Sequence, residues 1–131
     1  MEEIIMTNKP LHGSIVDLPD APGVFFPGAT KKVVFGPTHF WPDYVMRCWI
    51  LDPSGGEADT HHHPWPHWVV CIDGQCVNVI DDETFDMKAG DWMFVPGGSE
   101  HLFRNKSDKE KCSVLCIVPP EGDIPIDGKG C

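Results

Sequence analysis

The feature that most constrains the fold is the alternation of short β-prone runs with turns rich in glycine and proline. The chain of 131 residues contains 13 Gly and 13 Pro, and none of its segments shows a helical period over the length that a helix needs. The β-prone runs are Val33–Phe35, Tyr44–Leu51, Trp68–Ile72, Gln75–Ile80, Trp92–Val95, His101–Arg104 and Ser113–Val118. Many short strands at close spacing are typical of an all-β sandwich or barrel. We therefore expect an all-β protein with at most a short helical turn near the N-terminus.

The length predicts a single domain covering residues 1–131. The regular strand pattern places the barrel core at about 33–118. Segment 1–32 is weakly patterned, and we expect it to lie along a barrel edge or to reach a second subunit, which predicts a homodimer. Segment 119–131 is expected to form an extended tail. Asp73-Gly74, between two apolar runs, predicts a hairpin turn.

Charge and composition exclude several classes of partner. Asp and Glu total 20 against 10 Lys and Arg, a formal net charge of −10, which argues against binding to nucleic acid or to an anionic membrane. The start of the chain has neither the basic residues nor the apolar run of a secretory signal, so a cytoplasmic location is expected. The six cysteines form no CxxC motif and are expected to be reduced and buried.

Four of the seven histidines lie in the tract from Thr60 to His67. On a strand, His61 and His63 would share one face, because side chains alternate with a period of two. His67 has the same parity, although Pro64 and Pro66 must bend the chain between them. Neutral imidazole is the commonest protein ligand of transition metals. A cluster of surface histidines is the alternative interpretation of this tract.

The spacing around these histidines extends to a second segment. The first segment has the pattern G-x5-H-x-H-x3-H-x6-G from Gly55 to Gly74, and the second has the pattern G-x5-P-x-G-x2-H-x3-N from Gly90 to Asn105. Together they resemble the two signature motifs of the cupin superfamily. The matching positions are Gly55, His61, His63, Gly74, Gly90, Pro96, Gly98, His101 and Asn105.

The resemblance implies a double-stranded β-helix, or jelly-roll barrel, with a metal ion held inside it. It implies His61, His63 and His101 as ligands. His67 stands where the family has a glutamate, and we expect it to be the fourth ligand, with a site of three histidines as the alternative. The resemblance thus predicts one divalent transition metal. Imidazole suits Fe and Cu, which we favour, as well as Zn, Ni and Mn; Mg and Ca prefer oxygen ligands.

Further site residues are predicted by chemical type. Arg47 could hold a substrate carboxylate if its side chain points inward, and Tyr44 is a candidate proton donor. Trp49, Phe94 and Phe103 are candidates for the lining of the cavity. A surface position for Arg47 and core positions for the aromatic residues are the alternatives.

Three functions are compatible with these features. We favour a mononuclear metal-dependent oxidoreductase of the dioxygenase type, acting on a small oxygen-rich organic substrate. The resemblance implies this class because many single-domain cupins are dioxygenases. A non-redox isomerase, lyase or decarboxylase acting on a sugar or keto acid is the second hypothesis, since imidazole ligands leave the full charge on a Lewis-acidic metal. A metal- or ligand-binding sensor module is the third.

Overall fold

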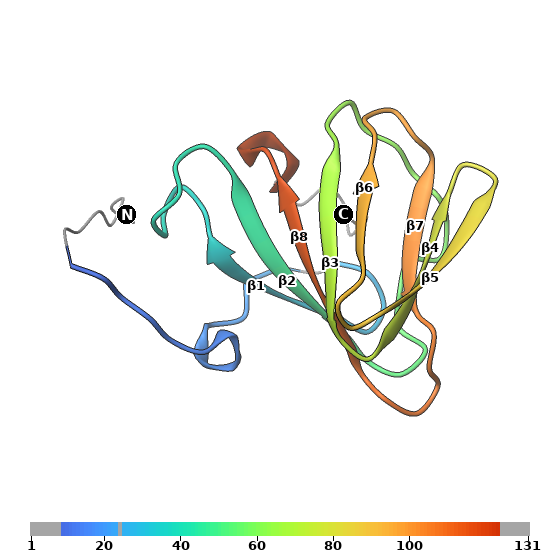
Figure 1. The fold of residues 1–131 in the computed structure, drawn as a ribbon, viewed down its shortest axis with the longest axis horizontal. Coiled ribbons are helices and arrows are strands. Elements are labelled where there is room, and N and C mark those ends of the chain that lie inside the picture. Colours follow the sequence, from blue (N-terminus) through green and yellow to red (C-terminus); the bar gives the residue numbers. More distant parts are fainter. Residues whose placement is uncertain (1–8, 24, 124–131) are drawn as a thin grey trace.

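The computed structural model describes residues 9–23 and 25–123, which form eight strands and two short 3-10 turns (Figure 1). The strands are β1 Ala29–Phe35, β2 Val45–Leu51, β3 His67–Asp73, β4 Gln75–Ile80, β5 Glu83–Lys88, β6 Trp92–Val95, β7 His101–Asn105 and β8 Cys112–Val118. They form an antiparallel five-stranded sheet, β1-β2-β8-β3-β6, and a three-stranded sheet, β5-β4-β7. The expected jelly-roll barrel is confirmed.

The five-stranded sheet turns alternate side chains toward the second sheet. Arg47 on β2 lies opposite Cys116 on β8, and Cys116 lies opposite Val69 on β3, so these three side chains point to the same side of the sheet. All three are buried. The same face of β2 also carries Trp49 and Leu51 into the core. The interior of the barrel therefore contains the cationic side chain of Arg47 among apolar ones, and Lys31, opposite Trp49 on β1, is a second buried cation on this side.

The prediction of a hairpin at Asp73-Gly74 is wrong. β3 pairs with β6 and β8, whereas β4 pairs with β5 and β7, so this turn carries the chain from one sheet to the other. Gly74 has a φ of +70°, and a Cβ built there would lie 2.5 Å from the carbonyl oxygen of Lys111. Glycine is required here for both reasons, and the tight corner brings β3 and β4 to opposite walls of the barrel.

Three details of the fold also differ from the expectations. The barrel core begins at Ala29 and not at residue 33. β5 was not predicted, because only Met87 of its six residues is buried and the strand lacks a clear apolar alternation. The described part of the tail is not extended, since Pro120–Asp123 form a 3-10 turn. The expected helical turn near the N-terminus is present at Ile15–Asp17.

The expectations for the N-terminal segment, the tail and Cys131 fall partly on residues that the structure does not describe. The N-terminal segment and the tail include residues 1–8 and 124–131, which lie outside the described residues. Cys131 is among them, while the five other cysteines are buried and lie outside any disulfide, as predicted. Within residues 9–23 and 25–123, no helix is long and apolar enough to span a membrane.

Candidate metal centre

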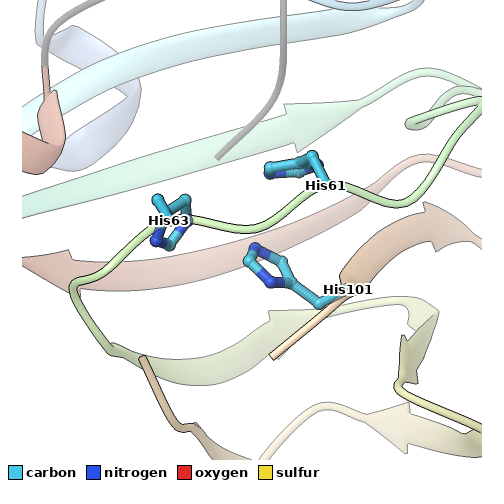
Figure 2. Close-up of side chains that lie close together, drawn as sticks. All are labelled: His61, His63 and His101. Carbon is cyan, nitrogen blue, oxygen red and sulfur yellow. The ribbon is translucent and has the colours of Figure 1, made fainter. Parts of the chain in front are cut away.

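His61, His63 and His101 converge, and their candidate ligand atoms all lie within 4.8 Å of one another (Figure 2). His101 is the first residue of β7. His61 and His63 do not lie on a strand, as the spacing had suggested, because the tract through Pro66 forms a loop. An isolated bridge positions His61 instead: its N–H donates to the carbonyl of His101 over 3.0 Å, and the N–H of His101 donates back over 2.9 Å. Backbone pairing thus joins the two motifs directly at the site.

His67 is a fourth imidazole beside this set of three. It is the first residue of β3, its side chain is only 2% exposed, and its Nε2 lies 2.6 Å from Nε2 of His63. The centroid of its ring is 5.1 Å from that of His101. The bend at Pro64 and Pro66 therefore brings His67 to the cluster, as predicted. Its role as a metal ligand remains a prediction.

Backbone carbonyls orient two of the imidazoles. Nδ1 of His63 lies 2.8 Å from the carbonyl oxygen of Trp65, and Nδ1 of His101 lies 2.9 Å from that of Ser99. A carbonyl oxygen can only accept, so in each ring Nδ1 must carry the proton and Nε2 keeps its lone pair. Trp65 also stacks on His63, with ring centroids 4.5 Å apart and planes 9° apart. Both Nε2 atoms are thereby prepared to bind a metal.

A carboxylate that the sequence analysis missed orients the third imidazole. Glu57 is 3% exposed, and its Oε2 lies 3.5 Å from Nδ1 of His61. Its Oε1 accepts the backbone N–H of Phe103 over 3.0 Å. An acidic residue inside the first motif, four positions before a ligand, was the available signal. Carboxylate partners of this kind fix the orientation of a metal-binding histidine and raise its basicity.

Arg47 points into the barrel, as its predicted role requires. Its side chain is 2% exposed, with Nη2 3.2 Å from Sγ of Cys116 and Nη1 3.5 Å from Oδ1 of Asp123. Its guanidinium lies 5.4 Å from the centroid of the Trp49 ring. Arg47 is thus an interior cation next to the histidines, and contact between it and a substrate remains a prediction.

The remaining candidates divide between the barrel interior and the outer face of the five-stranded sheet. Trp49 on β2 and Phe103 on β7 are buried within the core cluster. Tyr44 and Phe94 are not there. Both are partly exposed on the outer face, where their rings lie 6.0 and 5.8 Å from that of Trp68. The structure therefore does not bring Tyr44 or Phe94 to the site.

His62 lies between two members of the cluster in sequence but outside it in space. Its side chain is 67% exposed and pairs with Glu100. Glu100 therefore points away from the site. This exposed pair provides a natural control for the buried histidines.

The buried thiols have unusually weak acidity. Burial raises the pKa values of Cys48 and Cys71 and raises that of Cys112 to about 12. Burial also raises the pKa of Cys76, and the neighbouring Cys71 adds to the effect. Protonated thiols are poor nucleophiles and poor metal ligands, so these cysteines are core residues, as expected.

Comparison with known proteins identifies the family. The family model described as "Cupin domain" matches residues 48–118, which include every histidine of the cluster. The chain belongs to the cupin family. In this cupin, the matched region begins on β2 and ends with β8.

The cupin is similar to two curated proteins, and in each case the match covers about half of the other protein. It is 31% identical over 75 residues to "Polyketide synthase CurC" of Streptomyces cyaneus, with 56% of this chain and 48% of that protein covered. It is 30% identical over 109 residues to "Phomopsin biosynthesis cluster protein D" of Diaporthe leptostromiformis, with 82% and 49% covered. The chain thus spans about half the length of these relatives.

Among solved structures, the cupin resembles the polyketide cyclase RemF of Streptomyces resistomycificus. The TM-score is 0.70 with 24% identity, and 86% of this chain and 80% of that chain are covered. This likeness supports the jelly-roll fold.

Proposed function

We propose that this cupin binds one divalent transition metal through Nε2 of His61, His63, His101 and His67, and uses it as a Lewis acid in a non-redox cyclisation of a polyketone. The observation that carries the proposal is the convergence of imidazole rings whose Nδ1 atoms each face an oxygen atom. Nδ1 of His63 and His101 bonds a carbonyl oxygen, and Nδ1 of His61 faces Glu57. Such rings present neutral Nε2 donors, which suit a transition metal.

The charge of the donor set favours oxygen-rich, enolisable substrates. Neutral imidazoles cancel none of the charge of a divalent cation, whereas the glutamate that the family has at position 67 would cancel part of it. A bound cation of this kind polarises a carbonyl oxygen and acidifies the neighbouring C–H bond. A 1,3-diketone, the repeating unit of a polyketone, offers two such oxygens to the open positions of the site.

The reaction we propose needs no oxidant. The carbon between two carbonyl groups loses a proton and attacks a second carbonyl carbon of the same chain, and this C–C bond closes the ring. The oxygen of the attacked carbonyl takes up the proton, and the resulting hydroxyl leaves as water with the second hydrogen of the attacking carbon, which forms a C=C bond. The buried side chains of Trp49 and Phe103 exclude water from this part of the barrel, which strengthens electrostatic interactions within it. The names of one curated relative and of one solved structure, a polyketide synthase and a polyketide cyclase, support this substrate class.

Oxygen-dependent chemistry, which the sequence analysis favoured, remains the second candidate. Imidazole ligands suit Fe and Cu as well as Zn and Ni, so the donor set is compatible with either class. The two proposals differ in one measurable property, because only a dioxygenase consumes O₂ as its substrate reacts.

The first experiment tests metal binding. The chain is purified without added metal, its metal content is measured by mass spectrometry, and Zn²⁺, Ni²⁺ and Fe²⁺ are titrated after chelation. We expect one metal per chain, strong loss of binding in His61→Ala and His101→Ala, and normal binding in the control His62→Ala. Absence of binding, or equal loss in the control, would overturn the proposal.

The second experiment tests the reaction. The metal-loaded protein is incubated with thioesters of short poly-β-keto acids, and ring formation is followed by mass spectrometry while an electrode records O₂. We expect loss of water from the substrate without O₂ uptake, and no turnover after chelation. Stoichiometric O₂ uptake would replace the cyclase proposal with the dioxygenase.

A further inference from the structure

Asp123, at the end of the chain that the structure describes, places a carboxylate against two buried cations. Its Oδ1 lies 2.9 Å from Nζ of Lys31 and 3.5 Å from Nη1 of Arg47. Lys31 on β1 is 5% exposed and Arg47 on β2 is 2% exposed, so two neighbouring strands direct these charges into the barrel. Charge-assisted contacts of this kind bind carboxylates strongly where water is excluded. This part of the interior is therefore able to hold a carboxylate.

The indole ring of Trp49 lies beside the same two cations. The centroid of the ring is 5.8 Å from Nζ of Lys31 and 5.4 Å from the guanidinium carbon of Arg47. Trp49 is 2% exposed, and its Nε1 has no hydrogen-bond acceptor among the described residues. A buried donor that lacks an acceptor is rare in folded proteins, because the loss of its bond to water is not compensated. An oxygen-rich ligand bound beside the cations would supply this acceptor.

Asp123 has the properties of an occupant that can be displaced. It belongs to a 3-10 turn of only four residues, η2 Pro120–Asp123, which follows β8. Its side chain is 20% exposed, whereas those of Lys31 and Arg47 are 5% and 3% exposed. The carboxylate thus lies on the solvent side of the two cations. A second carboxylate that arrives from solvent can replace it while both strands stay in place.

The position of this carboxylate is close to the histidine cluster. Nη2 of Arg47 lies 3.2 Å from Sγ of Cys116, and Nδ1 of His67 lies 3.1 Å from the same atom. A single sulfur atom therefore separates the guanidinium from the imidazoles, so one small molecule can reach both. A divalent metal bound by neutral imidazoles would add its charge to that of Arg47, which favours an anionic ligand between them.

We propose that Lys31 and Arg47 form a subsite for the carboxylate end of the substrate, and that Asp123 occupies this subsite until the substrate displaces it. This inference rests on the proposed function and narrows its substrate class to a free keto acid. The carboxylate of that acid binds the two cations while its 1,3-diketone reaches the metal. The exchange leaves the charge of the interior unchanged, because one carboxylate replaces another. A thioester of the same chain lacks this anion and should bind more weakly than the free acid.

Two probes and four variants test the subsite. Succinylacetone carries a carboxylate and a 1,3-diketone, and its methyl ester is the matched neutral probe. Asp123→Asn removes the competing carboxylate, while Lys31→Met and Arg47→Met each remove one cation and leave Asp123 beside the other. Asp86→Asn is the matched control. It makes the same change of charge at a side chain that is 61% exposed and pairs with Lys106.

Isothermal titration calorimetry measures the affinity of each probe. In the Zn²⁺-loaded parent protein, we expect the acid to bind at least about tenfold more tightly than the ester, the effect of hydrogen bonds to a charged group. Asp123→Asn should widen this preference, because the subsite is then free of its competitor, and Asp86→Asn should leave it unchanged. Lys31→Met and Arg47→Met should each remove most of it.

Several results would overturn the inference. Equal affinities of the acid and the ester in the parent protein would do so without any variant. A preference that Asp123→Asn and Asp86→Asn change to the same extent would show that Asp123 does not compete for the subsite. Circular dichroism establishes that each variant is folded. If Asp123→Asn does not fold, the parent protein and the two cation variants still decide whether the subsite exists.

The same titrations after chelation separate this inference from the proposed function. The preference for the acid comes from the cations and should persist without metal, whereas Zn²⁺ should raise the affinity for both probes through the diketone. A preference without any effect of Zn²⁺ would contradict the proposed function and support the subsite. An effect of Zn²⁺ on both probes without a preference would support metal binding and overturn the inference. A preference that requires Zn²⁺ and survives in Arg47→Met would place the carboxylate on the metal and overturn it as well.

Discussion

The carboxylate of Glu57 offers the sharpest test of how the protein prepares its histidines. In Glu57→Gln, one amide atom can still accept the N–H of Phe103, which lies 3.0 Å from Oε1 in the parent protein. The other atom that faces Nδ1 of His61 becomes an N–H₂ group. This group presents hydrogen atoms to Nδ1 where the carboxylate presents a negatively charged oxygen 3.5 Å away, so it favours the His61 tautomer that has its proton on Nε2. The substitution therefore opposes metal binding while it preserves the fold.

The magnitudes follow from these two contacts. Losing the outer partner of a ligand weakens metal binding about 10–100-fold, which corresponds to about 1.4–2.8 kcal/mol. Glu57→Gln should change the free energy of unfolding of the metal-free protein by less than about 1 kcal/mol, because the bond to Phe103 survives. Glu57→Ala should weaken metal binding by a similar factor. It should also destabilise the metal-free fold by about 1–3 kcal/mol, since it leaves a buried N–H without its acceptor.

Competition with a chromophoric chelator measures the Zn²⁺ affinity, and urea unfolding in the presence of a strong chelator measures the stability of the metal-free protein. Glu100→Gln is the matched control, because Glu100 pairs with the exposed His62; it should leave both quantities unchanged. A Zn²⁺ affinity of Glu57→Gln within twofold of the parent protein would contradict the proposed role of Glu57. Equal urea midpoints for the unfolding of Glu57→Ala and Glu100→Gln would contradict it as well.

Three other predictions address the ligands, the thiols and the motif asparagine. His67→Ala should weaken Zn²⁺ binding at least tenfold and change the visible spectrum of the Co²⁺-substituted protein, while His62→Ala should do neither; an unchanged Co²⁺ spectrum in His67→Ala would exclude His67 as a ligand. Burial raises the pKa of Cys112 to about 12. Above about pH 8.5 the unfolded chain therefore loses thiol protons that the folded chain keeps. The free energy of unfolding falls with rising pH, by up to about 1.4 kcal/mol for each thiol and each pH unit. Urea unfolding between pH 8 and pH 11 should show this loss, with a shallower slope in Cys112→Ala; equal slopes would contradict it. Asn105→Ala should destabilise the fold by about 2–4 kcal/mol in thermal or urea unfolding, because it removes several partly buried hydrogen bonds. Nδ2 of Asn105 donates to the carbonyls of Asp52 and Glu110, and Oδ1 accepts the N–H of Ser107. Ser107→Ala keeps that N–H and should destabilise the fold less.

Local sequence determined the backbone features of this protein. The spacing of the two motifs identified His61, His63 and His101, and the structure brings them together. Two glycines of the motifs, Gly74 and Gly98, have positive φ values of +70° and +84°, and the motif residue Asn105 donates to backbone carbonyls. These features could be predicted because a turn, or a contact between neighbours in sequence, depends on a few adjacent residues.

Only the tertiary structure decided which side chains reach the metal centre. On β2, Arg47 and Trp49 lie on the inner face, and Met46 and Ile50 lie on the outer face. Both faces are largely apolar, so the sequence does not show which face lies inside the barrel. For this reason the sequence could not exclude Tyr44 and Phe94 from the site. Glu57 was missed because its contacts with His61 and Phe103 form only when the chain folds. Spacing in the sequence determines where a candidate ligand lies along the chain. Which nitrogen of its ring carries the proton depends on the atoms that the fold places beside that ring.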